Sequence, residues 1–459
     1  MKLQISKNAN VNYLSKVVKI QEFIKHPDPK VERIKCAVVD GFIITVGIDS
    51  EPGLYVYFPV LSQINPQLLQ YLNLYRDKNL NKDPEKTGYF EDKGIVKAIN
   101  LRGVKSEGFL MPITDLNNFI VDSVNVSLGD IDPNTEFDEI EHDGKTFWIS
   151  KKYIVPVTRT PGTQGSSKER KKKKGLNKII DEQFRFHYDT TLIKKCPHVL
   201  HPSDIIHISS KWHGTSGISA YVLCHKTLTW KEKIAKWLTG YNFDTYDYVY
   251  ASRSVIKNQY YNKEVTSGYY GCDVWKYADD YVRPFLTKGM TLYYEIVGYL
   301  PNGGYIQKNY DYGCESPIKV GDAIQYKEGK HFKVLIYRIT LTNIDGQVHE
   351  FSAHEVQTWC KQRNLLCAIE YYYGYAFDLY PDLEIDEHWS ENFLQMLAND
   401  KSFNMEQDSP ECNNKVPHEG LVIKIENMKS EAFKLKCFKF LGLEQDAALS
   451  GEANIEDNS

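Results

Sequence analysis

The sequence has 459 residues and a formal net charge of −4, with 42% hydrophobic and 25% charged residues. A chain of this length exceeds what one compact core holds, so we expect two or three domains. The slightly acidic balance excludes a basic nucleic-acid coat protein. Any nucleic-acid surface is therefore expected to be local, with an affinity that falls as salt rises.

The cysteines point to a reducing compartment. Nine are scattered along the chain, and no C-x-x-C pair occurs among them. This pattern disfavours a disulfide framework and a zinc site. No apolar run approaches the roughly 18 residues of a membrane span, and the N-terminus lacks the apolar core of a signal peptide. We therefore expect a cytoplasmic protein with no membrane partner.

Residues 1–157 are predicted to form short β-strands separated by turns. The strand-like segments are KVVKIQEFIKH, ERIKCAVVDGFIITVGI, LYVYFPV and GIVKAINLRGVKSEGFLMP, and NPQLLQYLNLYR interrupts them as one helix. About five short strands in this length fit a small closed β-barrel of the OB kind. Two stretches, KIQEFIKHPDPKVERIKCAVVDG and LRGVKSEGFLMP, also resemble the first hairpin and a late turn of tRNA-binding OB modules.

A sharp change of composition follows in TRTPGTQGSSKERKKKKG, residues 158–175. Pro, Gly and Ser give way to a run of lysines with no apolar anchor, which predicts a mobile linker. The lysines are either a solvated charge run or a loop that grips a phosphate backbone. Residues 176–445 then alternate strand and helix patterns. Residues 446–459 are acidic and polar, and are predicted to be a disordered tail.

The stretch SSKWHGTSG, residues 209–217, places Lys211 at the end of a predicted strand, against a turn rich in hydroxyl and amide donors. The simplest interpretation is a surface lysine beside a turn. The alternative is a lysine that forms a covalent intermediate, which requires partner residues elsewhere in the chain.

Four other stretches supply such partners. In LYYEIVGYL, Glu295 is a lone carboxylate in an apolar strand, where an unpaired charge is costly to bury. In PHEGLVIKIEN, Glu419 opens another apolar strand. In FKLKCF, Lys434 and Lys436 leave the same face of one strand and repel each other unless an anion lies between them. In YVYASRSVIKN, Arg253 lies in a turn of small hydroxyl residues.

In chain order these stretches read K-x-H-G-T, S-R-S, an apolar strand with one Glu, E-G-L-V-I-K and K-L-K. The series resembles motifs I, Ia, III, IV and V of the covalent nucleotidyltransferase superfamily of ligases and capping enzymes. Tyr337, in FKVLIYRI, lies where the family's motif IIIa strand carries an aromatic residue. The resemblance implies an α+β fold. An OB-like β-barrel at 1–157 would precede an ATP-grasp-like nucleotidyltransferase domain of antiparallel sheets flanked by helices, at 176–445.

The resemblance also implies a chemistry. The Lys211 amine would attack the α-phosphorus of ATP and expel pyrophosphate, and it must be neutral to do so. Lys434 and Lys436, with Mg²⁺ or Mn²⁺, would supply the positive field that favours this step. Glu295 and Glu419 would hold the metal, because Mg²⁺ prefers oxygen ligands. The other residues assigned to nucleotide binding are Trp212, His213, Gly214, Thr215, Arg253, Tyr337 and Arg185.

The histidine of the first motif, His213, indicates which branch of the superfamily the sequence resembles. DNA ligases and capping enzymes usually have K-x-D-G, whereas K-x-H-G-T is similar to the RNA ligase 2 group and the RNA-editing ligases. An OB module ahead of the transferase domain resembles a family of RNA ligases with N-terminal OB domains. We therefore expect an ATP-dependent RNA ligase of RNA repair that acts as a monomer on 3′-OH and 5′-phosphate ends.

In this interpretation the N-terminal module binds RNA and lies apart from the adenylylation site, with Arg102 and Lys105 as phosphate contacts. The alternatives are a capping guanylyltransferase, a DNA ligase of the same superfamily, and a non-catalytic RNA-binding protein with an OB module. The long stretch between Tyr337 and Glu419 is an insertion with no assigned role.

Overall fold

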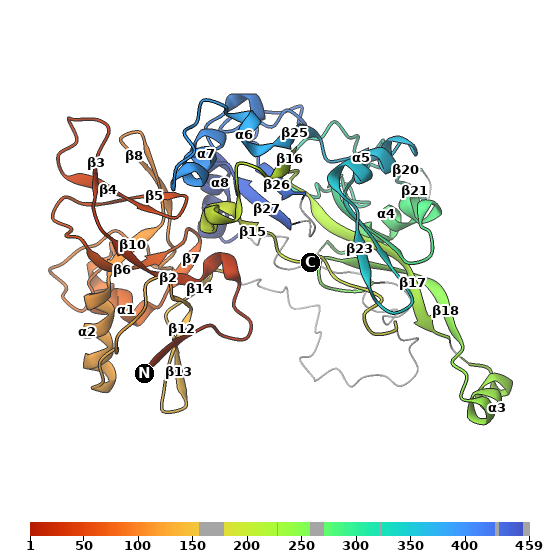
Figure 1. Ribbon diagram of the computed structural model, residues 1–459, viewed down its shortest axis with the longest axis horizontal. Coiled ribbons are helices and arrows are strands. Elements are labelled where there is room, and N and C mark those ends of the chain that lie inside the picture. The colour runs from red at the N-terminus through yellow and green to blue at the C-terminus, as the bar shows by residue number, and fades with distance from the viewer. Residues whose placement is uncertain (156–178, 227, 258–269, 321–322, 427–430, 453–459) are drawn as a thin grey trace.

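The computed structural model describes residues 1–155, 179–226, 228–257, 270–320, 323–426 and 431–452. The predicted linker at 158–175 lies outside these ranges. No helix in the described ranges is long and apolar enough to cross a membrane. The prediction of a mixed α+β fold with mainly antiparallel sheets is confirmed (Figure 1).

The N-terminal region is built from small antiparallel sheets. Their strands are β1 (Lys2–Gln4), β2 (Ser15–Ile20), β3 (Ile24–Lys25), β4 (Ile34–Val39), β5 (Phe42–Gly47), β6 (Gly53–Phe58), β7 (Ser62–Ile64), β8 (Ala98–Leu101), β9 (Val104–Glu107), β10 (Phe109–Pro112), β11 (Glu136–Phe137), β12 (Glu139–His142), β13 (Lys145–Trp148) and β14 (Ser150–Lys152). The largest sheet has the order β10-β6-β2-β11. Strands β2 and β6 alternate apolar side chains between two cores, which explains their nearly continuous apolar sequences.

The predicted closed barrel is not confirmed, because the described strands fall into separate sheets. Strands β5 and β9 lie close together but are not paired as strands of one sheet. The Thr45 N–H of β5 donates to the Ser106 side chain of β9, at 3.0 Å from Oγ. Two helices, α1 (Pro66–Tyr71) and α2 (Ile113–Val124), cover one of the cores. The sequence analysis missed α2, whose buried Leu116 and Ile120 have helical spacing.

Two larger sheets form the rest of the protein. The first is five-stranded, with the order β15 (Thr191–Leu192), β27 (Glu431–Lys436), β26 (Gly420–Ile425), β16 (Ile205–Ser210), β25 (Glu370–Tyr375). The second is six-stranded, with the order β18 (Asp244–Ser252), β17 (Thr215–His225), β19 (Met290–Gly298), β22 (Phe332–Thr342), β23 (Val348–Glu350), and β24 (Leu366–Cys367) beside β22. Strands β20 (Ile318–Val320) and β21 (Ala323–Gln325) form a separate hairpin.

Helices cover one face of each large sheet. They are α4 (Val274–Val282), α5 (Ala353–Lys361), α6 (Ala376–Leu379), α7 (Trp389–Leu397) and α8 (Phe438–Ser450). Helix α3 (Trp230–Thr239) has no buried residue and projects beyond β17 and β18 (Figure 1). Short 3-10 helices occupy Val11–Tyr13, Lys78–Leu80, Ile193–Lys195, Pro197–Val199, Arg283–Phe285 and Lys401–Phe403. Residues of α7 and α8 share a core with β16 and β26, and residues of α4 and α5 share one with β19 and β22. The opposite faces of the two sheets are left to line a cavity.

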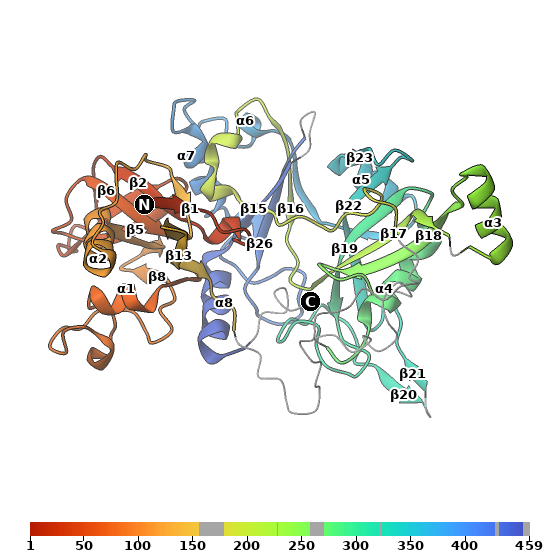
Figure 2. The ribbon, with the colours of Figure 1, turned by 90° about the horizontal axis from the view of Figure 1, so that it is seen from below.

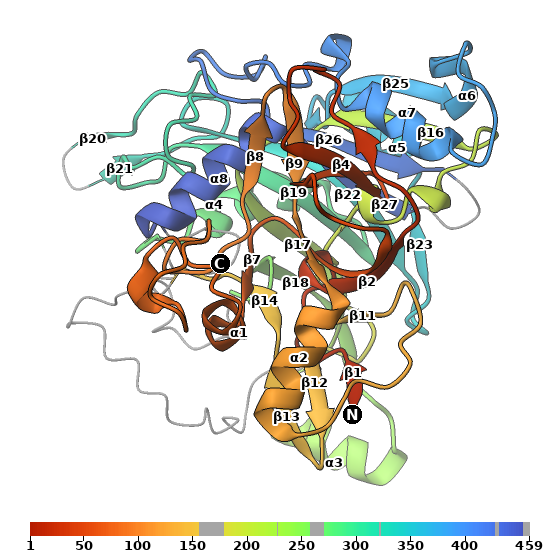
Figure 3. The same cartoon turned by 90° about the vertical axis from the view of Figure 1, so that its left-hand side faces the viewer.

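Helix α8 joins the two large sheets to the N-terminal region (Figures 2 and 3). The Gln445 side chain accepts a hydrogen bond from the Ala98 N–H at 2.8 Å, and Lys93 Nζ donates to the Leu449 carbonyl at 2.6 Å. The helix continues to Ser450, past the domain end predicted at residue 445, so the first residues of the predicted tail are helical. Residues 453–459 lie outside the described ranges.

Candidate active site

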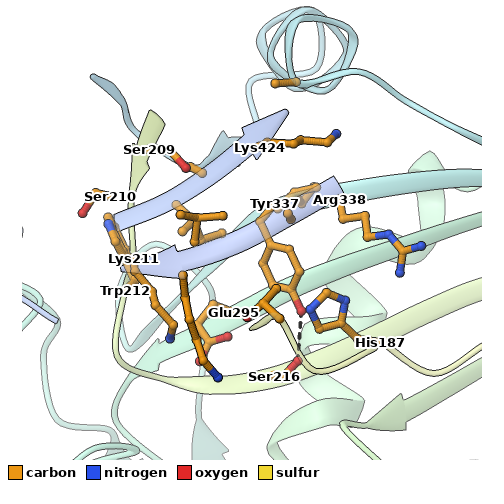
Figure 4. Close-up of a pocket in the computed structure, with 18 of the residues that line it drawn as sticks. His187, Ser209, Ser210, Lys211, Trp212, Ser216, Glu295, Tyr337, Arg338 and Lys424 are labelled. Carbon is orange, nitrogen blue, oxygen red and sulfur yellow. Dashed lines mark hydrogen bonds between the residues drawn. The ribbon is translucent and has the colours of Figure 1, made fainter. Parts of the chain in front are cut away.

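A cavity between the two large sheets gathers most of the predicted site residues (Figure 4). Those that line it are Lys211, Trp212, Arg253, Glu295, Tyr337, Glu419, Lys434 and Lys436. They come from the ends or faces of β16, β18, β19, β22, β26 and β27. The strand order brings these distant segments of the chain together.

Lys211 lies directly after β16, where the pairing of that strand with β26 ends. Its backbone N–H donates to the Gly420 carbonyl at 2.9 Å. Its Nζ lies 2.6 Å from Glu419 Oε1, and Glu419 is only 3% exposed. A lysine paired with a nearly buried carboxylate is held in one position at the cavity wall. The sequence analysis placed the two residues in one site but did not anticipate their direct contact.

Lys434 and Lys436 lie on the cavity face of β27, opposite Val422 and beside Gly420. Lys436 Nζ donates to both carboxylate oxygens of Glu444 at 2.7 Å, and both side chains are 11% exposed. The sequence analysis expected an anion near the two lysines. Glu444, on α8, is a protein anion that no local pattern identified.

Two glycines let the strands at the site approach closely. A Cβ atom at Gly214 would lie 2.4 Å from the Ile296 carbonyl oxygen and 2.8 Å from Glu295 Cγ. Gly420 has a φ of +137°, and a Cβ there would lie 2.1 Å from the Leu435 carbonyl oxygen. Both positions therefore require glycine for the cavity to keep its shape.

The first motif is divided between the cavity and the core behind it. Trp212 lines the cavity and stacks on Tyr312, with ring centroids 5.1 Å apart. His213 packs edge-on against Tyr310 and Phe440, at 4.9 and 5.0 Å, and does not line the cavity. Gly214 and Thr215 also lie outside the cavity lining, and Thr215 is 1% exposed. His213 Nδ1 also lies 3.6 Å from Glu419 Oε2, so the ring packs behind the carboxylate that contacts Lys211.

Glu295 and Tyr337 form the wall on the second sheet. Glu295 is paired with Ser216 across β19 and β17. The hydroxyls of Ser216 and Tyr337 lie 3.0 Å apart. Figure 4 shows the Tyr337 ring pointing toward Ser216. Burial raises the pKa of Tyr337, and the Glu295 carboxylate raises it further, so the phenol remains a neutral hydrogen-bonding group.

Arg185 does not line the cavity, contrary to the prediction. Its guanidinium donates to the carbonyls of Glu182 and Gly346, at 2.8 and 2.9 Å, on the rim of the second sheet. The residues that do line the cavity follow it directly, at 187–190. These residues belong to the aromatic and polar run FHYDTT, residues 186–191, which the sequence analysis did not single out. It assigned a role only to Arg185, directly before the run.

The N-terminal region supports this wall. The Asn12 side chain donates to the Thr190 carbonyl at 3.2 Å and accepts from the Leu192 N–H at 2.8 Å. Asn10 Nδ2 donates to Asp189 at 3.2 Å, and Asp189 forms an ion pair with Arg253. Asn10 and Asn12 of the N-terminal region therefore contact the segment that lines the cavity.

The far end of the cavity holds polar side chains that the sequence analysis missed. Lys424 Nζ donates to the Phe351 carbonyl at 2.8 Å, and burial lowers its pKa. Burial, aided by Lys424, lowers the pKa of His207 to about 4, so this imidazole is neutral at pH 7. Arg338 makes a two-point ion pair with Glu350, at 2.9 and 2.8 Å. Local patterns gave no reason to single out these residues among ordinary strand positions.

The two predicted RNA contacts lie on the β8–β9 hairpin, away from the cavity lining. Arg102 is exposed at its turn, with a φ of +54°. Lys105 Nζ donates to Asn399 Oδ1 at 3.0 Å and lies 3.4 Å from Glu406 Oε1. Lys105 therefore bridges to the inserted segment, whereas Arg102 faces solvent.

The arrangement of two large sheets around a lysine-containing cavity, behind a small N-terminal β-region, is that of an RNA ligase fold. No protein-family model matches the sequence, and a search of curated proteins found no relative. Solved structures of Naegleria gruberi RNA ligase do match. A lysine-to-alanine mutant with ATP and Mn has a TM-score of 0.51 at 14% identity, over 97% of this chain and 100% of that one.

Two other structures of the same Naegleria gruberi ligase give a similar result. An arginine-to-alanine mutant with ATP and Mn and an aspartate-to-alanine mutant without ligand each have a TM-score of 0.51 at 15% identity. Each match covers 95% of this chain and 99% of that one. This chain therefore shares its fold with these RNA ligase structures over nearly its whole length.

Proposed function

We propose that this protein is an ATP-dependent RNA ligase that joins RNA 3′-OH and 5′-phosphate ends. One observation carries the proposal: Lys211, Lys434, Lys436, Glu295 and Glu419, distant in sequence, line one cavity. A lysine near further cations and carboxylates is the side-chain set expected of a covalent nucleotidyl-transfer site. The fold shared with an RNA ligase favours RNA among possible substrates.

Three steps account for the proposed reaction. The Lys211 amine forms an N–P bond to the α-phosphorus of ATP, the bond to pyrophosphate breaks, and the amine loses a proton. The RNA 5′-phosphate then takes the AMP from the lysine. Finally, the RNA 3′-OH attacks the adenylylated 5′-phosphate, and AMP leaves. Glu419 holds the amine at the cavity wall, while Lys434 and Lys436 offset the negative charge that builds up on the phosphates.

The cavity residues fit a divalent cation together with the nucleotide. Glu295 and Glu419 present carboxylates to the same space as the two lysines of β27. Mg²⁺ is usually bound through one or two carboxylates plus substrate phosphates, so these two residues would hold Mg²⁺ or Mn²⁺. The ion would offset phosphate charge during transfer. Within the described ranges, no three His, Cys, Asp or Glu side chains cluster as a metal site.

The N-terminal region is proposed to be an OB-like RNA-binding module spanning residues 1–157, joined by a linker at 158–175 to the nucleotidyltransferase domain. Its support is the set of short antiparallel strands around shared cores and the hairpin that exposes Arg102. We further propose that the protein is monomeric and acts in the cytoplasm on broken RNA. These proposals rest on the sequence features given above.

Labelling with nucleotide is the direct test of the proposed function. Incubation with α-labelled ATP and Mg²⁺ is expected to leave label on the protein after denaturing electrophoresis, whereas α-labelled GTP leaves none. The labelled protein should then transfer AMP to a 5′-phosphorylated RNA. Labelling by GTP would indicate a capping enzyme, and sealing of all-DNA nicks alone would indicate a DNA ligase. A protein that binds RNA without labelling would favour a non-catalytic role.

Arg102→Ala is expected to weaken binding to nicked RNA by a few fold without slowing the labelling reaction. The exposed guanidinium at the hairpin turn suits a phosphate contact, and loss of one such contact reduces the slope of log affinity against log salt by about 1. Fluorescence anisotropy across a salt titration measures both quantities. Arg33→Ala, at another exposed arginine of the same region, is the matched control. An unchanged slope for Arg102→Ala would exclude this hairpin from RNA binding.

A further inference from the structure

A buried polar cluster lies behind the pair formed by Lys211 and Glu419. Ser210 and His418, which directly precede these residues in the chain, are 2% and 0% exposed. Ser210 Oγ lies 3.1 Å from His418 Nε2. The Ser210 hydroxyl also donates to Glu411 Oε1, and the second oxygen of Glu411 accepts from the Ser409 hydroxyl at 2.7 Å. The cluster therefore ties the ends of β16 and β26 to a third segment.

The hydrogen-bonding roles within this cluster follow from the number of protons available. Ser210 has one hydroxyl proton, and the Glu411 carboxylate can only accept. Because this proton goes to Glu411, the tautomer of His418 with its proton on Nε2 completes the chain to Ser210 Oγ. Glu411 is thus the terminal acceptor of a chain from His418 through Ser210.

Glu411 belongs to the insertion between Tyr337 and Glu419 that had no assigned role. The segment around it is fixed at several points. The Ser409 N–H donates to the Val416 carbonyl at 2.7 Å, and the His418 N–H donates to the Gln407 carbonyl at 3.0 Å. The Tyr310 hydroxyl donates to the Pro417 carbonyl at 2.9 Å. In the same insertion, the side chains of α7 are buried in the core beneath β16 and β26. The carboxylate is therefore carried by a rigid support.

We propose that Glu411 is a positioning residue for the formation of lysyl-AMP. Through Ser210 and His418 it fixes the ends of the two strands that hold Lys211 Nζ 2.6 Å from Glu419 Oε1. A nucleophile displaced by about 1 Å can lose on the order of 10²-fold in rate, so this support matters to the attack on ATP. The inference rests on the proposed function and gives the insertion a specific task within it.

The experiment compares the two half-reactions in the full-length protein. Glu411→Ala is expected to slow lysyl-AMP formation by about 10²-fold at saturating ATP, with the KM for ATP changed by less than about twofold. Sealing of pre-adenylylated RNA should keep its rate, because that step does not need attack by Lys211. Glu411→Gln should restore most of the rate, since its amide oxygen still accepts from Ser210. Glu387→Ala, at an exposed carboxylate of the same insertion, is the matched control.

Two further variants test the path and guard against misfolding. Ser210→Ala removes the donor to Glu411 and should slow lysyl-AMP formation with the same sparing of pre-adenylylated RNA. The double variant Ser210→Ala with Glu411→Ala should be no slower than the slower single variant, because residues that act through one contact are not additive. If Glu411→Ala does not fold, Ser210→Ala and Glu411→Gln still decide the question through the same two rates.

Several outcomes would overturn the inference. One is a Glu411→Ala protein that labels at the wild-type rate. Another is equal slowing of both half-reactions with a lowered melting temperature, which would give Glu411 a role in folding alone. Fully additive effects in the double variant would exclude Ser210 as the path. A wild-type protein that never labels with ATP would instead overturn the proposed function, and this inference with it.

Discussion

Replacement of Lys211 by alanine is expected to abolish the covalent labelling of the protein by α-labelled ATP. The side chain lies at the cavity wall against Glu419 and near both lysines of β27, and no other residue is assigned the attack on phosphorus. Loss of a covalent nucleophile removes the first step altogether. Sealing of pre-adenylylated RNA should survive, because its activated phosphate no longer needs the lysine.

The control is Lys226→Ala, at an exposed lysine just beyond β17 that pairs with Glu232. This variant should label and seal as the wild type does. The melting temperature of Lys226→Ala should stay close to the wild-type value. Lys211→Ala should lower it, because the nearly buried Glu419 carboxylate loses the ammonium group that lies 2.6 Å away. Persistent labelling of Lys211→Ala would place the nucleophile elsewhere and exclude the assignment of the first motif.

Alanine at Lys434 or at Glu419 is expected to slow lysyl-AMP formation by about 10²–10³-fold, because one preorganised electrostatic contact is worth that much in rate. Lys434 lines the cavity from the middle of the β27–β26 ladder, and Glu419 holds the attacking amine. Single-turnover labelling measures the effect, and thermal unfolding tests the fold. For Lys434→Ala, a large fall in melting temperature together with lost labelling would favour a structural role.

Lys436 needs a different design because it is paired with Glu444. Lys436→Ala alone leaves the Glu444 carboxylate, which is 11% exposed, without its ammonium partner, and should lower the melting temperature. Adding Glu444→Gln removes the stranded charge and should recover much of that stability. If Lys436 acts on the phosphates, the double variant stays slow in labelling despite its restored stability. Recovery of the labelling rate in the double variant would instead assign Lys436 to the fold.

Much of the site was predictable because its residues occupy distinctive positions in otherwise apolar strands. Glu295 in an apolar strand, Glu419 at the start of another and the K-x-K pair at 434–436 are locally conspicuous. In the structure these strands are neighbours in two facing sheets, so the local signals converge on one cavity. Of the K-x-H-G-T stretch, Lys211 and Trp212 line the cavity, while His213 packs behind it against aromatic rings and lies 3.6 Å from Glu419.

The features that the sequence did not reveal depend on contacts between distant segments. Glu411 meets Ser210 across a long sequence separation, and Glu444 reaches Lys436 from a helix predicted in part as a disordered tail. The closed barrel is not confirmed, because strand patterns specify which residues are extended but not whether edges such as β5 and β9 pair. In the segment around Arg185 the sequence drew attention to the charge, whereas the residues that line the cavity are those at 187–190.

The bonds from Asn12 to the cavity wall would couple the two proposed functions. Because Asn12 holds the backbone at Thr190 and Leu192, any shift of the N-terminal region on RNA binding would be transmitted to the wall of the proposed nucleotide site. Linkage is reciprocal, so any factor by which RNA changes the affinity for ATP is also the factor by which ATP changes the affinity for RNA. The effect of RNA on the affinity for ATP and the effect of ATP on the affinity for RNA then share one coupling free energy. An Asn12→Ala variant should reduce both effects by the same factor.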